Sequence, residues 1–170
     1  GVEAELISEN NSMVVVRAAP TDFAGFGHVV ILSDSGSLVT LENGWEYRGP
    51  AVISAISPSS GQFNTVVTIT GTDLRGFGGA VATVALGGKE ATIVNESNTE
   101  VVVIASSSVG ASGDEVVLVA DSGAIVNRTG LWQYIDEGVI TSVSPNYGQN
   151  GTLVTIIGER LLGSGQGLLA

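Results

Sequence analysis

The sequence has no cysteine, one histidine and only six lysine and arginine residues among 170 positions. The core must therefore hold without the disulfide that pins the sheets of antibody-type sandwiches, and His28 alone cannot build a zinc site. The formal net charge of −11 repels phosphate backbones and anionic lipid headgroups, so no nucleic-acid partner is expected. No apolar run reaches the ~18 residues typical of a membrane span, which argues against membrane insertion in this segment.

Aromatic residues make up 5% and charged residues 14%, whereas hydrophobic residues reach 44%, enough for a packed core. Short runs rich in Val, Ile and Thr favour strands over helices. No segment sustains the 3.6-residue apolar period of an amphipathic helix. The sequence therefore predicts an all-β protein.

The sequence repeats itself at an offset of 87 residues, and roughly 40% of the aligned positions match without a gap. This length is close to that of one small sandwich domain. The matched segments include Ser57-Pro58 with Ser144-Pro145, Val67-Thr68-Ile69 with Val154-Thr155-Ile156, Val14-Val15-Val16 with Val101-Val102-Val103, Asp34-Ser35-Gly36 with Asp121-Ser122-Gly123, and Trp45 and Tyr47 with Trp132 and Tyr134.

The offset divides the chain into three parts. Residues 1–49 are the back part of one repeat, residues 50–136 are a complete repeat, and residues 137–170 are the front part of a third. We expect the chain to be a window on a longer array. The alternative is a circularly shifted pair of domains, in which the two partial units complete one sandwich.

The complete repeat contains short strand-like segments separated by turn residues. The expected strands are 52–57, 65–71, 80–86, 89–94, 100–105, 115–120 and an interrupted last strand over 124–126 and 131–135. Strands of this number and spacing predict a two-sheet sandwich. Only about five residues separate Tyr134 from the next strand at Val139, so successive units should stack stiffly.

The runs 53–61 and 65–74, and their counterparts 140–145 and 158–161, resemble the opening of an IPT/TIG repeat. IPT/TIG repeats are immunoglobulin-like modules of plexins and related receptors, some transcription factors and many cell-surface proteins. The resemblance implies tandem immunoglobulin-like β-sandwiches of the E-set group, but the module serves many tasks. The structural signature comprises Pro58, Gly61, Gly71, Leu74, Asp121, Gly123, Trp132, Tyr134, Pro145, Gly148 and Gly158.

Ordinary structural roles account for these signature residues. Pro58 ends a strand because it cannot donate to a ladder, and Gly61 and Gly71 are interpreted as permitting turn geometries closed to other residues. Leu74 and Trp132 are expected to fill the core rather than contact a ligand.

No motif in the sequence predicts catalysis, a cofactor or a bound metal. His28 aligns with Glu115, so its chemistry is not repeated, and no G-x-S-x-G nucleophile elbow is present. The glycine-rich stretches 76–79 and 163–167 open no helix, which argues against phosphate binding. Asp34 and Asp121 occupy equivalent turns, where capping is favoured over calcium binding. We therefore expect a protein that is not an enzyme.

Four N-glycosylation sequons fall at predicted turns or loops, beginning at Asn10, Asn95, Asn127 and Asn150. They make N-linked glycans possible if the source secretes through a eukaryotic pathway.

The leading functional hypothesis is a structural or adhesive module of a repetitive extracellular or cell-surface protein. It would form a rod, fibre or surface appendage through contacts with other protein chains, either copies of itself or neighbouring repeats. The alternatives are a ligand-binding receptor ectodomain and an accessory module of a polysaccharide-active enzyme.

Overall fold

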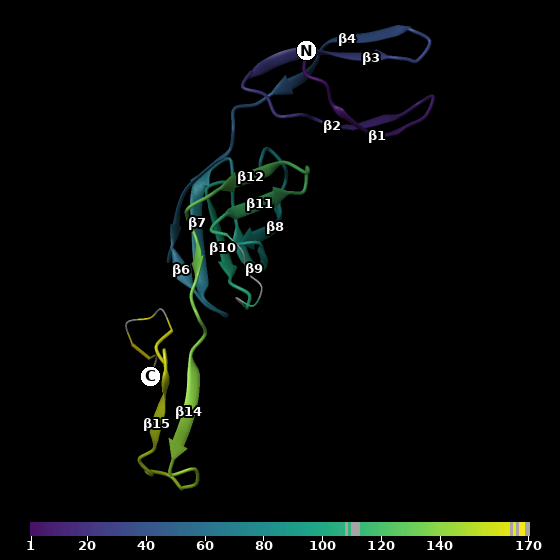
Figure 1. Ribbon diagram of the computed structural model, residues 1–170. Coiled ribbons are helices and arrows are strands. Elements are labelled where there is room, and N and C mark those ends of the chain that lie inside the picture. The colour runs from purple at the N-terminus through teal and green to yellow at the C-terminus, as the bar shows by residue number, and fades with distance from the viewer. Residues whose placement is uncertain (108, 110–112, 164, 166, 169–170) are drawn as a thin grey trace. The chain divides into compact units, whose positions relative to one another are not determined.

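The structure is a computed structural model that describes residues 1–107, 109, 113–163, 165 and 167–168 (Figure 1). The chain divides into two compact units, Gly1–Pro50 and Ala51–Ala170. All regular secondary structure in the described residues is β, which confirms the predicted class. Within those residues, no helical stretch is long and apolar enough to cross a membrane.

The second unit is built around one seven-stranded antiparallel sheet with the order β12-β11-β8-β9-β10-β7-β5. Its strands are β5 (Val52–Ser57), β7 (Val66–Thr72), β8 (Val81–Leu86), β9 (Lys89–Glu96), β10 (Glu100–Ile104), β11 (Val116–Ala120) and β12 (Ile125–Arg128).

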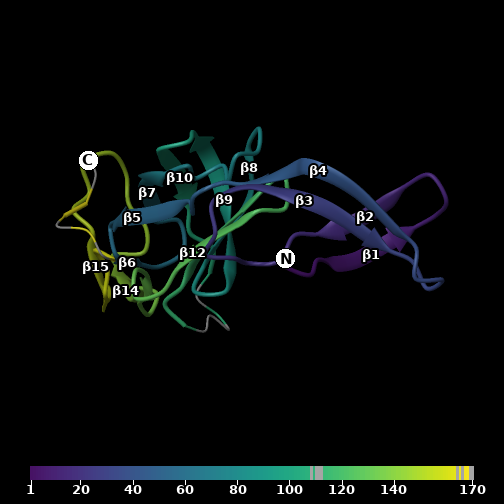
Figure 2. The same ribbon diagram turned by 90° about the horizontal axis from the view of Figure 1, so that it is seen from above.

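Strand β9 belongs to both layers of this fold. Its first residues, Lys89–Ala91, pair with β8, and its later residues pair with β10. Arg128 at the end of β12 donates 2.8 Å hydrogen bonds to the carbonyl oxygens of Ile53 and Ser54 in β5. The first and last strands of the sheet order are therefore connected, and the sheet wraps into the expected two-layer sandwich (Figures 1 and 2).

The core lies between these layers and follows the period-two pattern of strands. On β7, Val67 and Ile69 are fully buried while the threonines between and after them point outward. The other fully buried large side chains come from most of the remaining strands and two loops: Ile53, Leu74, Val84, Leu86, Val101, Val103, Val116, Leu118 and Trp132.

A short parallel ladder completes the sandwich. Strand β6 (Ser60–Gly61), between two predicted strands, pairs with β13 (Gln133–Tyr134), which lies in the second part of the predicted interrupted strand. Two-residue strands carry no periodicity, so their pairing depends on tertiary packing rather than on local pattern. The six longer strands that were predicted agree with the structure to within two residues at each end.

The remaining strands form three hairpins. In the first unit, β1 (Glu5–Glu9) pairs with β2 (Val14–Arg17), and β3 (Gly25–Leu32) pairs with β4 (Leu38–Tyr47). In the second unit, β14 (Val139–Ser144) pairs with β15 (Thr155–Glu159). The compact units divide after Pro50, while the predicted repeat boundaries at 49/50 and 136/137 stay predictions.

Candidate interaction surface

The aromatic pair of the signature is part of the core. Trp132 is 1% exposed, and its ring meets that of Tyr134 edge-on, with centroids 5.3 Å apart and planes at 88°. Leu74 is fully buried in the same cluster. Edge-to-face contacts of this kind stabilise a fold beyond simple area burial. These side chains hold the sandwich together and are not available to a ligand.

Two polar atoms of this pair lie buried without a hydrogen bond in the described structure, Trp132 Nε1 and the Tyr134 hydroxyl. Burial of the side chain raises the pKa of Tyr134. The backbone of Ser106 lies close to the phenol and lowers this pKa by a smaller amount, although the two groups do not form a hydrogen bond. The raised pKa of Tyr134 contributes to the stability of the folded state while the phenol is neutral. This contribution is complete below pH 10.0, the ordinary pKa of tyrosine, and is lost as the pH rises through the higher pKa of the folded state.

Four of the signature glycines, Gly61, Gly71, Gly148 and Gly158, are needed for space, which corrects the interpretation of Gly61 and Gly71 as permitting special turn geometries. Neither Gly61 nor Gly71 has a positive φ. A Cβ on Gly61 would lie 2.6 Å from Thr65 Oγ1, and one on Gly71 would collide with the carbonyl oxygen of Val52. Gly148 and Gly158 reproduce these two approaches against Thr152 and Val139.

The remaining signature residues also lie in equivalent places in the two copies. The Ser57-Pro58 and Ser144-Pro145 peptide bonds, at the ends of β5 and β14, are both cis. Asp121 lies in the turn after β11, where its Oδ1 accepts a 2.9 Å hydrogen bond from the Gly79 amide. Gly123 closes that turn at a φ of 85°, a conformation that glycine adopts without strain.

The sequons lie in two kinds of environment, which corrects the expectation that all four fall in turns or loops. Asn95 is on β9 and Asn127 is on β12, whereas Asn10 and Asn150 lie outside strands; all four are exposed. The Asn127 Nδ2 donates a 2.6 Å hydrogen bond to Glu115. Asn10 instead uses its Oδ1 to cap the turn at Ser12 and Met13. Glycan attachment is therefore better accommodated at Asn10 and Asn150.

Side chains that could carry chemistry are dispersed. His28 Nδ1 accepts a hydrogen bond from the Asn43 amide at 3.2 Å. No cluster of three or more His, Cys, Asp or Glu residues that could hold a metal occurs in the residues the structure describes. The predicted glycine-rich stretch 163–167 includes residues 164 and 166, which lie outside those residues.

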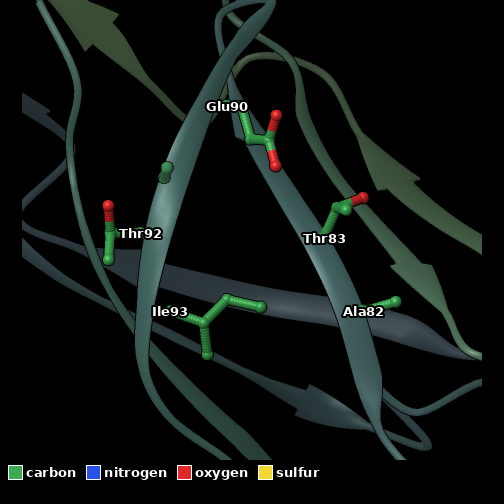
Figure 3. Close-up of a pocket in the computed structure, with 6 residues that line it drawn as sticks. Ala82, Thr83, Glu90, Thr92 and Ile93 are labelled. Carbon is green, nitrogen blue, oxygen red and sulfur yellow. The ribbon is translucent and has the colours of Figure 1, made fainter.

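A shallow depression of about 450 Å³ lies over β8 and β9 (Figure 3). Glu90 is its one ionisable lining residue. Its other lining side chains are small or β-branched: Ala82, Thr83, Ala91, Thr92 and Ile93. This set offers hydroxyl and apolar contacts, and it does not assemble an acid–base pair.

The most distinctive surfaces are apolar faces on the hairpins outside the sandwich. In the first unit, six large apolar residues that align with buried core positions are between 39% and 65% exposed. These residues, hereafter the N-terminal apolar face, are Val14, Val16, Val29, Ile31, Val39 and Trp45. Trp45 is the repeat counterpart of the buried Trp132.

The β14–β15 hairpin shows the same property. Its residues that align with core positions, hereafter the C-terminal apolar face, are between 38% and 60% exposed, although their counterparts in the sandwich are at most 1% exposed. They are Ile140, Val154, Ile156 and Leu161. In the complete sandwich the counterparts of both faces pack in the core between the two layers.

One ion pair on the sandwich has a testable pH dependence. Arg75 donates two 2.9 Å hydrogen bonds to the carboxylate of Glu96, which also accepts one from the Val81 amide. The Arg75 hydrogen bonds hold the pKa of Glu96 below its ordinary value of 4.5, although burial and the negative charge of Asp121 act the other way.

We expect Glu96→Gln to destabilise the sandwich near neutral pH and to have a smaller effect in acid. A lowered folded-state pKa contributes stability that is complete above 4.5 and is lost as the pH falls through the folded value. Urea denaturation of both proteins from pH 7 down to pH 3 measures this. A difference in unfolding free energy that stays constant over that range would contradict it.

These features define an immunoglobulin-like β-sandwich accompanied by hairpins of the same sequence type. Residues 51–134 match the IPT/TIG domain family. Residues 51–134 accordingly form an IPT/TIG domain, as the sequence resemblance predicted. A comparison with curated proteins found no match.

Several solved structures resemble the chain at low identity. The plexin A4 extracellular region is 19% identical, with 85% of this chain and 13% of that chain covered and a TM-score of 0.47. An auxiliary nutrient binding protein from Bacteroides thetaiotaomicron is 20% identical, with coverages of 53% and 22% and a TM-score of 0.43. A protein from the same organism, named as a candidate phosphatase, is 25% identical, with coverages of 54% and 20% and a TM-score of 0.43. The chain thus spans at most 22% of the length of these proteins.

Proposed function

We propose that this protein is a non-catalytic structural or adhesive module of a larger repetitive protein at the cell surface or outside the cell. The observation that carries the proposal is the 87-residue repeat, in which the front strands of both copies share a cis Ser-Pro bond and the same two crowded glycine positions. Repeated strand-rich modules of this kind make contacts with protein chains through their strand edges and flat faces. Its partners are then protein chains, either neighbouring repeats or further copies.

A firm connection between repeats supports a load-bearing or spacing role. Strand β13 ends at Tyr134 and β14 begins at Val139. In this connection Gln62 Oε1 accepts a 3.1 Å hydrogen bond from the Gly138 amide, and Ser107 Oγ donates a 3.0 Å hydrogen bond to Glu137. A short connection with its own hydrogen bonds restricts hinge motion more than a flexible linker does.

Small-angle X-ray scattering of the protein tests this role, at a concentration where light scattering gives the monomer mass of 17.2 kDa. We expect an elongated particle with a well-defined cross-section, because stiffly joined repeats extend along the chain. A compact, near-spherical particle would count against a structural array.

A further inference from the structure

The connection that follows the sandwich, residues 135–138, leaves the domain alongside β6. Directly after β13, the Ile135 amide donates a 2.9 Å hydrogen bond to the carbonyl oxygen of Gly61, the last residue of β6. The connection therefore begins beside the loop that follows β6. Further along it, the Gly138 amide donates a 3.1 Å hydrogen bond to Oε1 of Gln62, the first residue of that loop.

Gln62 is held by a turn that does not use its side chain. Its amide donates a 3.1 Å hydrogen bond to Thr65 Oγ1, and its carbonyl oxygen accepts a 3.2 Å hydrogen bond from the Thr65 amide. Gly61 allows this close approach, because a Cβ on it would lie 2.6 Å from the same Oγ1. Both backbone polar groups of Gln62 are thus bonded within the turn, and its side chain is left to bind the connection.

The segment 148–152, which aligns with 61–65, forms the same turn. The Gln149 amide donates a 2.9 Å hydrogen bond to Thr152 Oγ1, and the Thr152 amide donates a 3.0 Å hydrogen bond to the Gln149 carbonyl oxygen. The two residues between glutamine and threonine differ in the copies, whereas the pattern Gly-Gln-x-x-Thr is kept. The turn uses only the backbone of its glutamine, so it does not by itself account for glutamine at this position in both copies.

The connection is also bound at Glu137. Its carboxylate accepts a 3.0 Å hydrogen bond from Ser107 Oγ in the sandwich, and its carbonyl oxygen accepts a 3.2 Å hydrogen bond from Arg160 Nε after β15. This residue therefore contacts both the sandwich and the β14–β15 hairpin. In the first copy Pro20 and Pro50 align with Ser107 and Glu137, so the carboxylate contact is particular to this connection.

The two connections of the chain have the same length. Four residues, 48–51, separate β4 from β5, and four residues, 135–138, separate β13 from β14. Their sequences differ, Arg-Gly-Pro-Ala against Ile-Asp-Glu-Gly, but the last residue of each supplies a backbone amide. Every residue except proline carries this donor. A side-chain acceptor that binds it therefore depends on the length of the connection and not on its sequence.

We propose that Gln62 is a positioning residue that fixes the connection to the following repeat, and that the same contact recurs at each connection between repeats. The glutamine accepts a hydrogen bond from the last amide before the first strand of the next repeat. Its partner is an IPT/TIG-type repeat that follows in the same chain at this spacing, and we expect Gln149 to bind the connection to a further repeat in the same way. The inference rests on the proposed structural role and identifies the residue that joins its units.

Amide hydrogen exchange of Gly138, measured by NMR on the intact protein, tests this contact. Gln62→Met removes the acceptor oxygen at nearly constant side-chain length. We expect it to speed exchange of the Gly138 amide several-fold, while amides in β7 and β10 keep their rates. Gln62→Glu retains an acceptor oxygen and should keep the parental Gly138 rate. Gln149→Met is the matched control and should leave that rate unchanged, because Gln149 occupies the aligned turn at the opposite end of the β14–β15 hairpin.

Unchanged Gly138 exchange in Gln62→Met would overturn the proposal, as would equal acceleration in Gln149→Met or loss of protection in Gln62→Glu. Faster exchange of β7 and β10 together with Gly138 in Gln62→Met would also overturn it, because Gln62 would then stabilise the sandwich rather than the connection. The scattering measurement separates this contact from the structural role. An elongated particle with unchanged Gly138 exchange keeps the role and removes the contact, whereas a compact particle with Gln62-dependent exchange keeps the contact and removes the role.

Discussion

Replacement of Trp132 by alanine is expected to destabilise the sandwich by about 3–5 kcal/mol, enough to unfold a domain of ordinary stability. The side chain is 1% exposed and packs edge-on against Tyr134 within the core cluster. Its removal leaves a cavity between the two layers that neighbouring strands cannot close. Urea denaturation followed by far-UV circular dichroism measures the loss.

Trp45→Ala is the matched control, because Trp45 occupies the same repeat position but is 49% exposed. We expect this substitution to leave the unfolding of residues 51–134 within about 0.5 kcal/mol of the parent, as for other surface changes. Equal destabilisation by the two substitutions would contradict the assignment of Trp132 to a complete core and of Trp45 to an open face.

Gly71→Ala is expected to destabilise the sandwich by about 1–3 kcal/mol, the usual range for overpacking. A Cβ at this position collides with the carbonyl oxygen of Val52 and comes within 2.6 Å of a Leu74 methyl group. The Val52 carbonyl belongs to the β5 backbone, so relief requires β5 to move away from β7. Thermal unfolding monitored by circular dichroism measures the effect.

Gly49→Ala provides the comparison for Gly71→Ala, since a Cβ on Gly49 meets no atom within 4 Å. We expect its melting temperature to stay close to that of the parent. If Gly71→Ala is as well tolerated as Gly49→Ala, the close approach of β5 to β7 is not present in solution.

The sequence predicted the strands of the sandwich because their signals are local. Alternating Val, Ile and Thr residues locate β7, and turn residues bound most other strands. The large apolar side chains of Leu74 and Trp132 predicted their core positions, and both residues are buried. Local signals failed where geometry is set by distant contacts, as at the β6–β13 ladder and at Gly71, whose neighbour is 19 positions away in β5.

The exposure of the apolar residues on the hairpins was harder to predict, because local sequence patterns do not determine it. Val14 and Val101 are identical residues in matching surroundings along the chain, yet one is exposed and the other is buried. Periodicity reports that a side chain belongs on an apolar face, but it does not report what covers that face. The 87-residue offset shows which part of the repeat each hairpin matches: the hairpins of residues 1–49 match the back part, and the hairpin of residues 137–170 matches the front part.

Fold membership by itself does not settle what an IPT/TIG module does. In this chain the proposed role rests on the strand-rich repeat, since the described residues hold no cluster of titratable side chains that could bind a metal.

Amide hydrogen exchange on the intact protein at low concentration tests the central claim most directly. The account predicts that amides in β7, β10 and β11 exchange only through global unfolding and share one high free energy of opening. Amides in the loop between β7 and β8 should exchange much faster, because most of that segment lies outside the ladders. Uniformly fast exchange across residues 51–134 would contradict the account.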